Sequence, residues 1–528
     1  MYPGGSDNLI LTGFMGTGKT SVGQEIARRL GREFVDMDAL IEAREGLTVA
    51  EIFSQRGADY FRRLEAALCH ELAARQKLVI ATGGGALIPP GNHQVLGASG
   101  PVVCLMATLD EILHRLETAQ DRPLLNVPDR QARVAALMAE RAKAYRRIPL
   151  QVNTTGLSVA QVADRVLAVA EPPPPVAIPV SHPGGEYAVH LGRGLLARAG
   201  SRLQEQSPGN AVALVTNPTV GSLYAHQVIE SLERASFETT ICTVPDGEPY
   251  KTLDTIRMLY DSFVKAGLDR KGTVLALGGG VIGDAAGFAA ATYLRGVLLV
   301  QMPTTLLAMV DASVGGKVAV DHPRGKNLIG AFKQPETVLA DPDVLATLPH
   351  KELDNGLAEA IKAGIVGDPA LFAHLETFGP NPLPWLIERA IRVKVAVVEK
   401  DPYERGRRAV LNLGHTFGHA LELLSGYSLS HGKGVSIGLA AAARLSARMG
   451  LCEPALVARV ERALAYLGLP TTYRGPTPAQ LWDAMATDKK RRGKTLRFVL
   501  PRAAGDVFVT DQVKRADVLA VLETLKEA

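Results

Sequence analysis

With 528 residues, the chain is too long for one hydrophobic core, and its length predicts two to four domains. Its apolar content of 47% and charged content of 21% are ordinary for a globular protein, and no apolar run reaches the ~20 residues of a membrane span. The formal charge of +4 comes from scattered basic residues, so we expect neither a nucleic-acid nor a membrane partner.

The cysteines and the N-terminus indicate the compartment. Cys69, Cys104, Cys242 and Cys452 lie far apart in the sequence and form no CxxC motif. This usage is typical of a reducing compartment, without disulfides or thiolate-bound zinc. The N-terminus has neither the basic region nor the apolar stretch of a signal peptide. We therefore expect a cytoplasmic protein.

The first predicted elements surround a glycine-rich turn. Residues 8–12 form a short apolar strand, residues 13–20 read GFMGTGKT, and an amphipathic helix is predicted over residues 21–30. A phosphate-binding loop requires this order of strand, GxxxxGK[ST] turn and helix. Lys19 is expected to reach the β- and γ-phosphates of a nucleotide, and the Thr20 hydroxyl to ligate Mg²⁺. The loop residues expected to wrap the phosphates are Gly13, Gly16, Thr17 and Gly18.

Five further motifs follow in the first 170 residues. They are FVDMD at 34–38, YFRRLE at 60–65, ATGGGAL at 81–87, DRPLL at 121–125 and ERAKAY at 140–145. Asp36 and Asp38, two residues apart, share one face if the first motif ends a strand. Each motif alone also fits a capped helix, an exposed charge pair or a turn. Together, and in this order, they resemble shikimate kinase over residues 7–165.

The resemblance implies roles for individual residues. Asp38 is expected to bind and polarise the acceptor hydroxyls, while Arg62 and Arg141 clamp the shikimate carboxylate. Gly84 and Gly85 let the backbone approach the ring, Arg122 belongs to a lid over the ATP phosphates, and Asp36 acts on Mg²⁺ through water. The alternatives are a related small-molecule kinase such as gluconate kinase, or a nucleotide sensor without catalysis. Asp38 with the two arginines favours a small carboxylated polyol as substrate.

A proline-rich stretch, EPPPPVAIP at residues 171–179, marks the boundary after this domain. Successive prolines favour an extended polyproline II segment and exclude a helix or a central strand. We therefore predict a kinase domain at 1–170, a linker at 171–179 and a second region from residue 180.

The second region begins with an alternation of strands and helices over residues 185–345 that is typical of an α/β sheet. Strands are predicted at 211–216, 273–277 and 297–302. GGGVIGD follows the second of them and contains G-x-G-x-x-G at the start of a helix. Because no acidic residue stands about 20 positions later, the motif alone leaves NAD and a generic phosphate turn open.

Histidines dominate the next informative stretch, LNLGHTFGHALELLSGYSLSH at residues 411–431. The part before Tyr427 is predicted to be helical, so His415 and His419 share one face. Spacing alone makes these two the metal-ligand pair, with a carboxylate from elsewhere. Two ordinary histidines on a partly buried helix are the alternative. Upstream, Glu359 and Lys362 lie three apart on one face of another predicted helix.

Several blocks of this region together resemble 3-dehydroquinate synthase from about residue 185 to the C-terminus. They are DGE..K, GGGVIGD, QMPTTLLA, DASVGGK, GKN, AEAIK, LNLGHTFGHALE and TDKK…LRFVLP. The resemblance implies an α/β protein with a Rossmann-like NAD-binding half at 180–345 and a mainly helical metal-binding half at 346–528. The first domain, as a kinase of the P-loop type, implies a parallel sheet with helices on both faces.

The same resemblance implies the site residues of the second region. The zinc ligands become Glu359, His415 and His431, so His419 moves from the metal to the substrate. NAD positions are Asn217, Glu248, Lys251, Gly279, Gly280, Val281, Asp284, Thr304, Thr305 and Lys326. Substrate or catalytic positions are Asp311, Lys317, Asn327, Lys362, Lys394, Arg408, Asn412, His419, His431 and Lys489, with Lys490 as an alternative to the last. Arg295 is expected from a neighbouring subunit, which implies a homodimer.

Combined, the two resemblances imply a bifunctional shikimate-pathway enzyme. One domain uses ATP and Mg²⁺ to phosphorylate shikimate. The other uses NAD⁺ and a divalent metal, Zn²⁺ or Co²⁺, to convert 3-deoxy-D-arabino-heptulosonate 7-phosphate into 3-dehydroquinate and phosphate, with NAD⁺ regenerated. Another sugar-phosphate cyclase, a polyol dehydrogenase of the same fold and a scaffold with inactive sites are the alternatives.

Overall fold

The computed structural model describes residues 8–116, 129–146, 148, 150–170, 175–380, 382–426, 428–491 and 496–527. The chain divides into two compact units, Met1–Pro173 and Pro174–Ala528. In the part of the chain so described, no helix combines the length and the apolar composition needed to cross a membrane.

The first unit contains a five-stranded sheet in the order β2-β3-β1-β4-β5, and every neighbouring pair in it is parallel. Its strands are β1 (Leu9–Gly13), β2 (Glu33–Asp36), β3 (Leu78–Ala81), β4 (Val102–Met106) and β5 (Leu150–Asn153). All residues of β1 and β3 are buried, as expected where helices cover both faces of a parallel sheet.

Alternate residues of β1 explain the two layers of helices. Leu9 and Leu11 join one apolar cluster with α1 (Lys19–Leu30) and α8 (Val159–Ala170). Ile10 joins another with α4 (Ala58–Ala73) and α5 (Pro90–Ala98). The remaining helices of the unit are α2 (Met37–Glu45), α3 (Val49–Arg56), α6 (Leu109–Leu116) and α7 (Arg130–Arg146).

The second unit contains a seven-stranded sheet in the order β6-β7-β14-β11-β10-β8-β9. Its strands are β6 (Val176–His182), β7 (Gly185–Leu191), β8 (Ala211–Thr216), β9 (Glu238–Thr243), β10 (Thr273–Gly278), β11 (Leu298–Pro303) and β14 (Thr337–Ala340). The predicted strands at 211–216, 273–277 and 297–302 correspond to β8, β10 and β11. Only β6 pairs antiparallel, at the edge, where Pro179 is tolerated opposite Ala188. This strand begins at Val176, inside the stretch expected to be linker.

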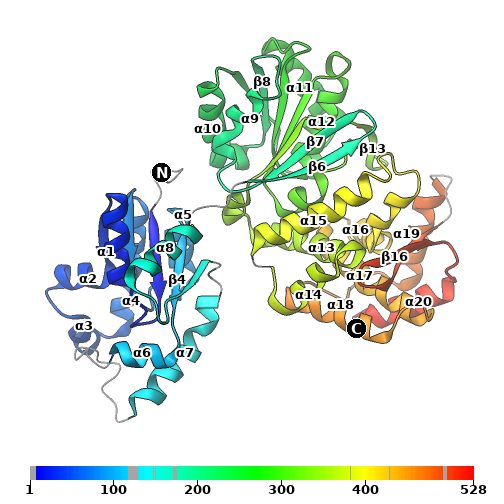
Figure 1. The fold of residues 1–528 in the computed structure, drawn as a ribbon. Coiled ribbons are helices and arrows are strands. Elements are labelled where there is room, and N and C mark those ends of the chain that lie inside the picture. The colour runs from blue at the N-terminus through cyan, green and yellow to red at the C-terminus, as the bar shows by residue number, and fades with distance from the viewer. Residues whose placement is uncertain are drawn as a thin grey trace. The chain divides into compact units, whose positions relative to one another are not determined.

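Helices cover the sheet of the second unit and also build a separate half (Figure 1). Those associated with the sheet are α9 (Ala199–Gln204), α10 (Pro218–Arg234), α11 (Leu253–Lys265) and α12 (Gly280–Thr292). The helical half comprises α13 (His350–Gly367), α14 (Pro369–Phe378), α15 (Leu383–Val398), α16 (His415–Leu424), α17 (His431–Arg448), α18 (Pro454–Tyr466), α19 (Pro478–Arg491) and α20 (Arg515–Leu525), with the hairpin β15 (Phe498–Ala503) and β16 (Asp506–Thr510). Most residues of α17 are buried, which makes it the central helix of this half.

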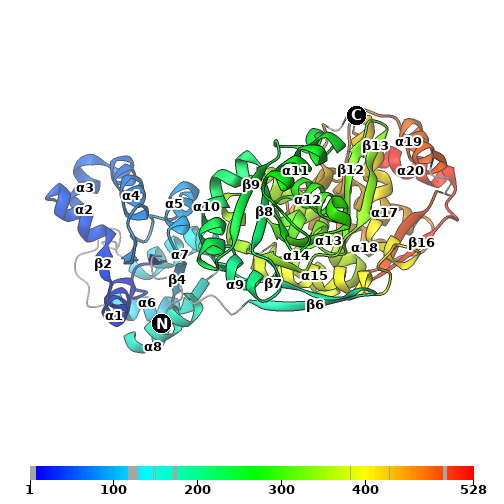
Figure 2. The same ribbon diagram turned by 90° about the horizontal axis from the view of Figure 1, so that it is seen from above.

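A second hairpin connects the two halves. Its strands are β12 (Lys317–His322) and β13 (Gly325–Phe332), which pair antiparallel. Its base packs against α12, and Figure 2 shows it extending beside the helical half. Lys317 and Lys326, both predicted site residues, lie on this hairpin and form ion pairs with side chains of the helical half.

Candidate active sites

The glycine-rich loop of the first unit closes tightly between β1 and α1. Gly13, Gly16 and Gly18 all have positive φ angles, and a Cβ on Gly13 would lie 2.2 Å from the Leu105 carbonyl oxygen. The Lys19 ammonium donates to the carbonyl oxygens of Gly13 and Phe14 at 2.9 and 3.0 Å. The buried Thr17 hydroxyl donates to the Phe14 carbonyl at 2.7 Å. The backbone and Lys19 thus form one closed turn at the N-terminus of α1, where a helix favours anions.

A hydroxyl and a carboxylate meet beside this loop. The Thr20 hydroxyl donates to Asp36 Oδ2 at 2.7 Å. Asp36 ends β2, and its other oxygen accepts from the backbone N–H of Asp38 at 3.1 Å, which caps α2. Asp38 therefore lies in the first turn of a helix. The FVDMD motif spans the end of β2 and the start of α2, so Asp36 and Asp38 do not share the face of one strand. Oxygen donors of these two types suit Mg²⁺.

The expected shikimate-binding residues converge on one glycine segment after β3. A Cβ added to Gly83 would lie 2.4 Å from Asp38 Oδ1, and one added to Gly85 would lie 2.6 Å from Arg62 Nη1. Arg141 Nη1 donates to the Gly84 carbonyl at 3.2 Å. Arg141 Nε is buried and has no hydrogen-bond partner among the described residues, as expected of a group that awaits a ligand.

Sequence reasoning missed Glu65, which lies 1% exposed and accepts a hydrogen bond from Arg62. Burial raises the pKa of Glu65, while the neighbouring Arg62 guanidinium lowers it. The sequence did carry a signal for this contact, because Glu65 follows Arg62 by three residues, a spacing that places both on one face of α4. Arg122, the expected lid residue, lies outside the described residues.

In the second unit, one carboxylate and two imidazoles meet at a point between three helices. Glu359 of α13 is 1% exposed, and its Oε1 lies 3.5 Å from His415 Nε2 of α16 and 3.3 Å from His431 Nε2 of α17. One ligand atom from each residue lies within 4.8 Å of the others. Two imidazole nitrogens and a carboxylate oxygen are the donors of many zinc sites that keep a position open.

The Nδ1 atom of each imidazole has a hydrogen-bond partner on the side away from Glu359. His415 Nδ1 contacts the Leu413 carbonyl at 3.2 Å, and His431 Nδ1 contacts Glu422 Oε1 at 3.0 Å. Such outer contacts orient the metal-binding nitrogen and select its tautomer. Burial lowers the pKa of His431, but its contacts with Glu359 and Glu422 raise it to about 10 overall. Two imidazoles and one carboxylate within reach of one another nevertheless fit a divalent metal, whose binding would displace the proton held on His431.

Sequence spacing had paired His415 with His419, and the structure places them in different candidate groups. His419 lies on the same face, with ring centroids 5.2 Å apart. It belongs, however, to a second candidate group with Glu422 and His431, not to the one built on Glu359. Glu422 was missed by sequence reasoning, although it follows His419 by three residues on the same helix.

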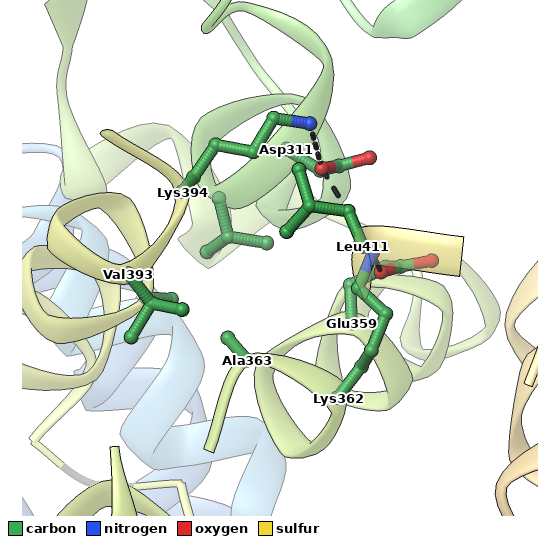
Figure 3. Close-up of a pocket in the computed structure, with 9 residues that line it drawn as sticks. Asp311, Glu359, Lys362, Ala363, Val393, Lys394 and Leu411 are labelled. Atoms are coloured by element: carbon green, nitrogen blue, oxygen red, sulfur yellow. Dashed lines mark hydrogen bonds and ion pairs between the residues drawn. The ribbon is translucent and has the colours of Figure 1, made fainter. Parts of the chain in front are cut away.

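A pocket next to Glu359 is lined by two lysines, two carboxylates and five apolar residues (Figure 3). Lys362 forms an ion pair with Glu359 and lies 4.0 Å from Asp311, whose carboxylate also accepts a hydrogen bond from Lys394. Burial raises the pKa of Asp311, but the two ammonium groups lower it to about 2 overall. Burial lowers the pKa of Lys394. Such a dense buried charge cluster is typical of a site for a polar ligand.

The expected NAD residues gather at the carboxyl end of β10. Lys251, 4% exposed, contacts Asp284 at 2.5 Å and donates to Asn327 Oδ1 at 2.6 Å. The buried Thr304 hydroxyl has no hydrogen-bond partner among the described residues. A dinucleotide is expected outside the carboxyl ends of parallel strands, which is where these groups lie.

The other expected NAD residues lie on the elements around them. Lys326 lies 3.4 Å from Glu248 and 3.9 Å from Glu422. Asn217 caps α10, and a Cβ on Gly279 would lie 3.1 Å from Thr305. Gly280 and Val281 begin α12.

A further cluster links β12 to the loop after α15. Glu404 forms an ion pair with Lys317 and accepts from Asn412 Nδ2 at 3.4 Å. Arg408, 2% exposed, donates to the carbonyls of Gly315 and Pro402 at 3.0 and 2.8 Å. Glu404 was not predicted, and no motif marked it. The side chain of Lys489 lies outside the described residues.

Comparisons with known proteins agree with the division of the chain into two units. The shikimate kinase family model matches residues 15–171. The models for the N-terminal and C-terminal parts of 3-dehydroquinate synthase match residues 241–355 and 356–491.

Individual relatives match one unit or the other. A 3-dehydroquinate synthase of Desulforamulus reducens is 48% identical over 345 residues, which are 64% of this chain and 96% of its own. The solved 2-epi-5-epi-valiolone synthase of Streptomyces hygroscopicus, with NAD⁺ and Zn²⁺ bound, is 32% identical at a TM-score of 0.60, covering 64% of this chain and 96% of its own. A shikimate kinase from Acinetobacter baumannii, solved in complex with shikimate, is 36% identical at a TM-score of 0.30, covering 31% of this chain and 92% of its own.

Proposed function

The chain belongs to the 3-dehydroquinate synthase family and carries a shikimate kinase domain at residues 15–171, and from this premise we propose which residues serve each reaction. It is a bifunctional shikimate-pathway enzyme. One unit phosphorylates shikimate with ATP and Mg²⁺. The other converts 3-deoxy-D-arabino-heptulosonate 7-phosphate into 3-dehydroquinate and phosphate with NAD⁺ and Zn²⁺ or Co²⁺.

In the kinase unit, we propose that the two guanidinium groups next to Gly84 and Gly85 bind the shikimate carboxylate. Arg62 and Arg141 support this role because both approach the same glycine segment. Asp38, against Gly83, is then positioned to accept a hydrogen bond from the acceptor hydroxyl. Lys19 binds the transferred phosphate, and Thr20 with Asp36 holds Mg²⁺, directly or through water.

In the cyclase unit, the meeting of Glu359, His415 and His431 beside the lysine-lined pocket carries the proposal. When bound, the metal supplies Lewis-acid activation of a substrate hydroxyl, and NAD⁺ supplies reversible hydride acceptance. Asp311, ionised beside Lys362 and Lys394, accepts hydrogen bonds from substrate hydroxyls. Lys317, Lys362, Asn327 and His419 bind the phosphate, and Arg408 with Lys394 suits the carboxylate and hydroxyls.

Metal analysis with cyclase assays tests the ligand set. Glu359→Ala and His431→Ala should each lose the metal and the activity, whereas His419→Ala should keep the metal and lose activity. If His419→Ala loses zinc while His431→Ala keeps it, the spacing-based pair is correct and the proposed set is wrong. Product analysis distinguishes a 3-dehydroquinate synthase from another sugar-phosphate cyclase or a polyol dehydrogenase. We expect 3-dehydroquinate as the product, and net accumulation of NADH would contradict a cyclase.

Lys19→Ala tests the kinase unit. It should abolish shikimate-dependent ADP formation because the lysine charge on the transferred phosphate is lost. Cyclase activity of the same preparation is the internal control, and it should not change. Retained ADP formation would contradict the assignment.

We propose a homodimer in which Arg295 of one copy enters the site of the other. Arg295 is exposed and has a φ of 68°, next to Leu294 at 50°, and two left-handed non-glycine residues in succession favour a functional constraint. Sedimentation should give twice the chain mass. Mixing Arg295→Ala with a metal-site variant should restore part of the cyclase activity. We also propose a cytoplasmic location, which the free state of all four cysteines supports.

A further inference from the structure

The carbonyl oxygen of Gly84, in the glycine segment after β3, accepts hydrogen bonds from two side chains of one helix. Arg141 and Tyr145, which ends the ERAKAY motif, lie four residues apart on α7 and therefore share a face. The Tyr145 hydroxyl donates to the Gly84 carbonyl, and Arg141 Nη1 donates to the same oxygen at 3.2 Å. The guanidinium already has a proposed role at the shikimate carboxylate, whereas the tyrosine hydroxyl has none.

The position of Tyr145 is fixed by its surroundings. The residue is buried in the apolar cluster that also contains Phe14 and Cys104. Its backbone carbonyl accepts a hydrogen bond from Gln151 Nε2 at 3.1 Å, which ties the end of α7 to β5. Burial raises the pKa of Tyr145 to about 12, although the Arg141 charge acts to lower it. The hydroxyl therefore keeps its proton at neutral pH and remains a donor.

The contact with Tyr145 also sets the direction of a backbone N–H. A trans peptide points its carbonyl oxygen and its N–H to opposite sides, so a Gly84 carbonyl held toward α7 turns the Gly85 N–H away from α7. Gly85 is buried, and in the described part of the chain its N–H donates no hydrogen bond. A buried N–H normally has an acceptor, so this one suits an anionic group that arrives with a substrate.

The peptide between Gly84 and Gly85 is tightly surrounded. A Cβ on Gly84 would lie 3.3 Å from Arg141 Nη1 and 3.6 Å from the carbonyl oxygen of Gly13 in the phosphate-binding loop. A Cβ on Gly85 would lie 2.6 Å from Arg62 Nη1. Both arginines proposed to bind the carboxylate thus contact this peptide, and a change in its orientation would alter their geometry.

We propose that Tyr145 is a positioning residue for the shikimate carboxylate, a role that rests on the proposed function. Its hydroxyl holds the peptide in the orientation that presents the Gly85 N–H to the carboxylate. It also shares the Gly84 carbonyl with Arg141, so the guanidinium does not have to satisfy both lone pairs of that oxygen. Without the hydroxyl, Arg141 is drawn toward the Gly84 carbonyl and away from the carboxylate.

Steady-state kinetics of the full chain with Tyr145→Phe, which keeps the ring, test the proposal. The KM for shikimate should rise about fivefold, the effect of one lost hydrogen bond, while kcat and the KM for ATP change less than about twofold. This split is expected because the carboxylate does not react and is bound equally in the ground state and the transition state. Calorimetric titration with shikimate alone should show the same fivefold loss of affinity.

Two controls separate the carboxylate contact from a general change in the kinase unit. Methyl shikimate carries no charge at this position, and its inhibition constant should differ less than about twofold between Tyr145→Phe and wild type. Tyr60→Phe makes the same change on α4, where the hydroxyl contacts Glu45 and Arg56 instead of the glycine segment. It should leave every constant unchanged.

The proposal is overturned if Tyr145→Phe leaves the KM and the affinity for shikimate unchanged, or if shikimate and its methyl ester lose affinity equally. A purely structural role predicts that kcat falls or the KM for ATP rises as well, and either result also overturns the proposal. Failure of the kinase assignment is a separate result, since it would appear as absent shikimate-dependent ADP formation by the wild type.

Discussion

At the scale of single residues, we expect zinc affinity to depend on the second hydrogen-bond partner of each imidazole that we propose as a metal ligand. His431 is held by Glu422 through Nδ1, so its Nε2 is directed at Glu359. We expect Glu422→Gln to weaken zinc binding by about 10- to 100-fold, the usual effect of losing an outer carboxylate. Competition with a chelator measures this. Glu388→Gln on α15, where the carboxylate pairs with Arg392, is the matched control and should change nothing.

A second residue-scale prediction concerns pH. Burial and the nearby Asp343 charge raise the pKa of Asp341 to about 6, above its ordinary value of 3.8. A carboxyl group that keeps its proton longer when folded destabilises the folded state as pH rises between those two values. The free energy of unfolding of the second unit should therefore fall, by up to about 3 kcal/mol, from about pH 4 to about pH 6.

Asp341→Asn should remove this slope, because an amide can still accept the Leu196 N–H bond without titrating. Urea unfolding at about pH 4 and about pH 6 measures the difference. Asp261→Asn, at an exposed position of α11, is the control. Equal slopes in the Asp341→Asn variant and the wild type would contradict the prediction.

At the scale of elements, the close crossing of α16 and α17 sets the distance between His415 and His431. A Cβ on Gly438 would lie 2.0 Å from the Gly414 carbonyl oxygen, and one on Gly418 would lie 2.9 Å from the Gly434 backbone. Gly438→Ala must therefore push the helices apart, at a cost of about 1–3 kcal/mol.

We expect Gly438→Ala to lose zinc although it touches no ligand. Metal content after dialysis measures this, with circular dichroism to confirm that the helices persist. Lys433→Ala, an exposed position of the same helix, should retain the metal. Full zinc occupancy in Gly438→Ala would show that the crossing distance does not matter.

At the scale of the whole molecule, each unit has apolar clusters of its own. We therefore expect two calorimetric unfolding transitions, one raised by ATP with shikimate and the other by NAD⁺ with zinc. A ligand at 100 times its Kd adds about 2.7 kcal/mol to the transition that it stabilises. Lys19→Ala should lose only the shift caused by ATP. A single transition that responds to both ligand sets would contradict the prediction.

Sequence alone was sufficient where function depends on neighbours in the chain. The phosphate-binding loop from Gly13 to Thr20 is one continuous turn, and the positions of β8, β10 and β11 along the chain follow from short apolar runs. Both depend on local geometry that residue type and spacing already encode. The family resemblance added the ligands and substrate residues that spacing could not select.

Tertiary structure was needed wherever distant segments meet. Spacing on one helix paired His415 with His419, but the packing of α13 against α17 brings Glu359 to His431 instead. Glu422 and Glu404 became informative only through their contacts with His431 and Lys317. A helix face shows which side chains can act together, while the crossing of three helices decides which of them do. The sequence by itself determined the two chemistries of this protein, and only the tertiary structure revealed the contacts of Glu65, Glu404 and Glu422, because these join groups through packing that spacing along the chain does not encode.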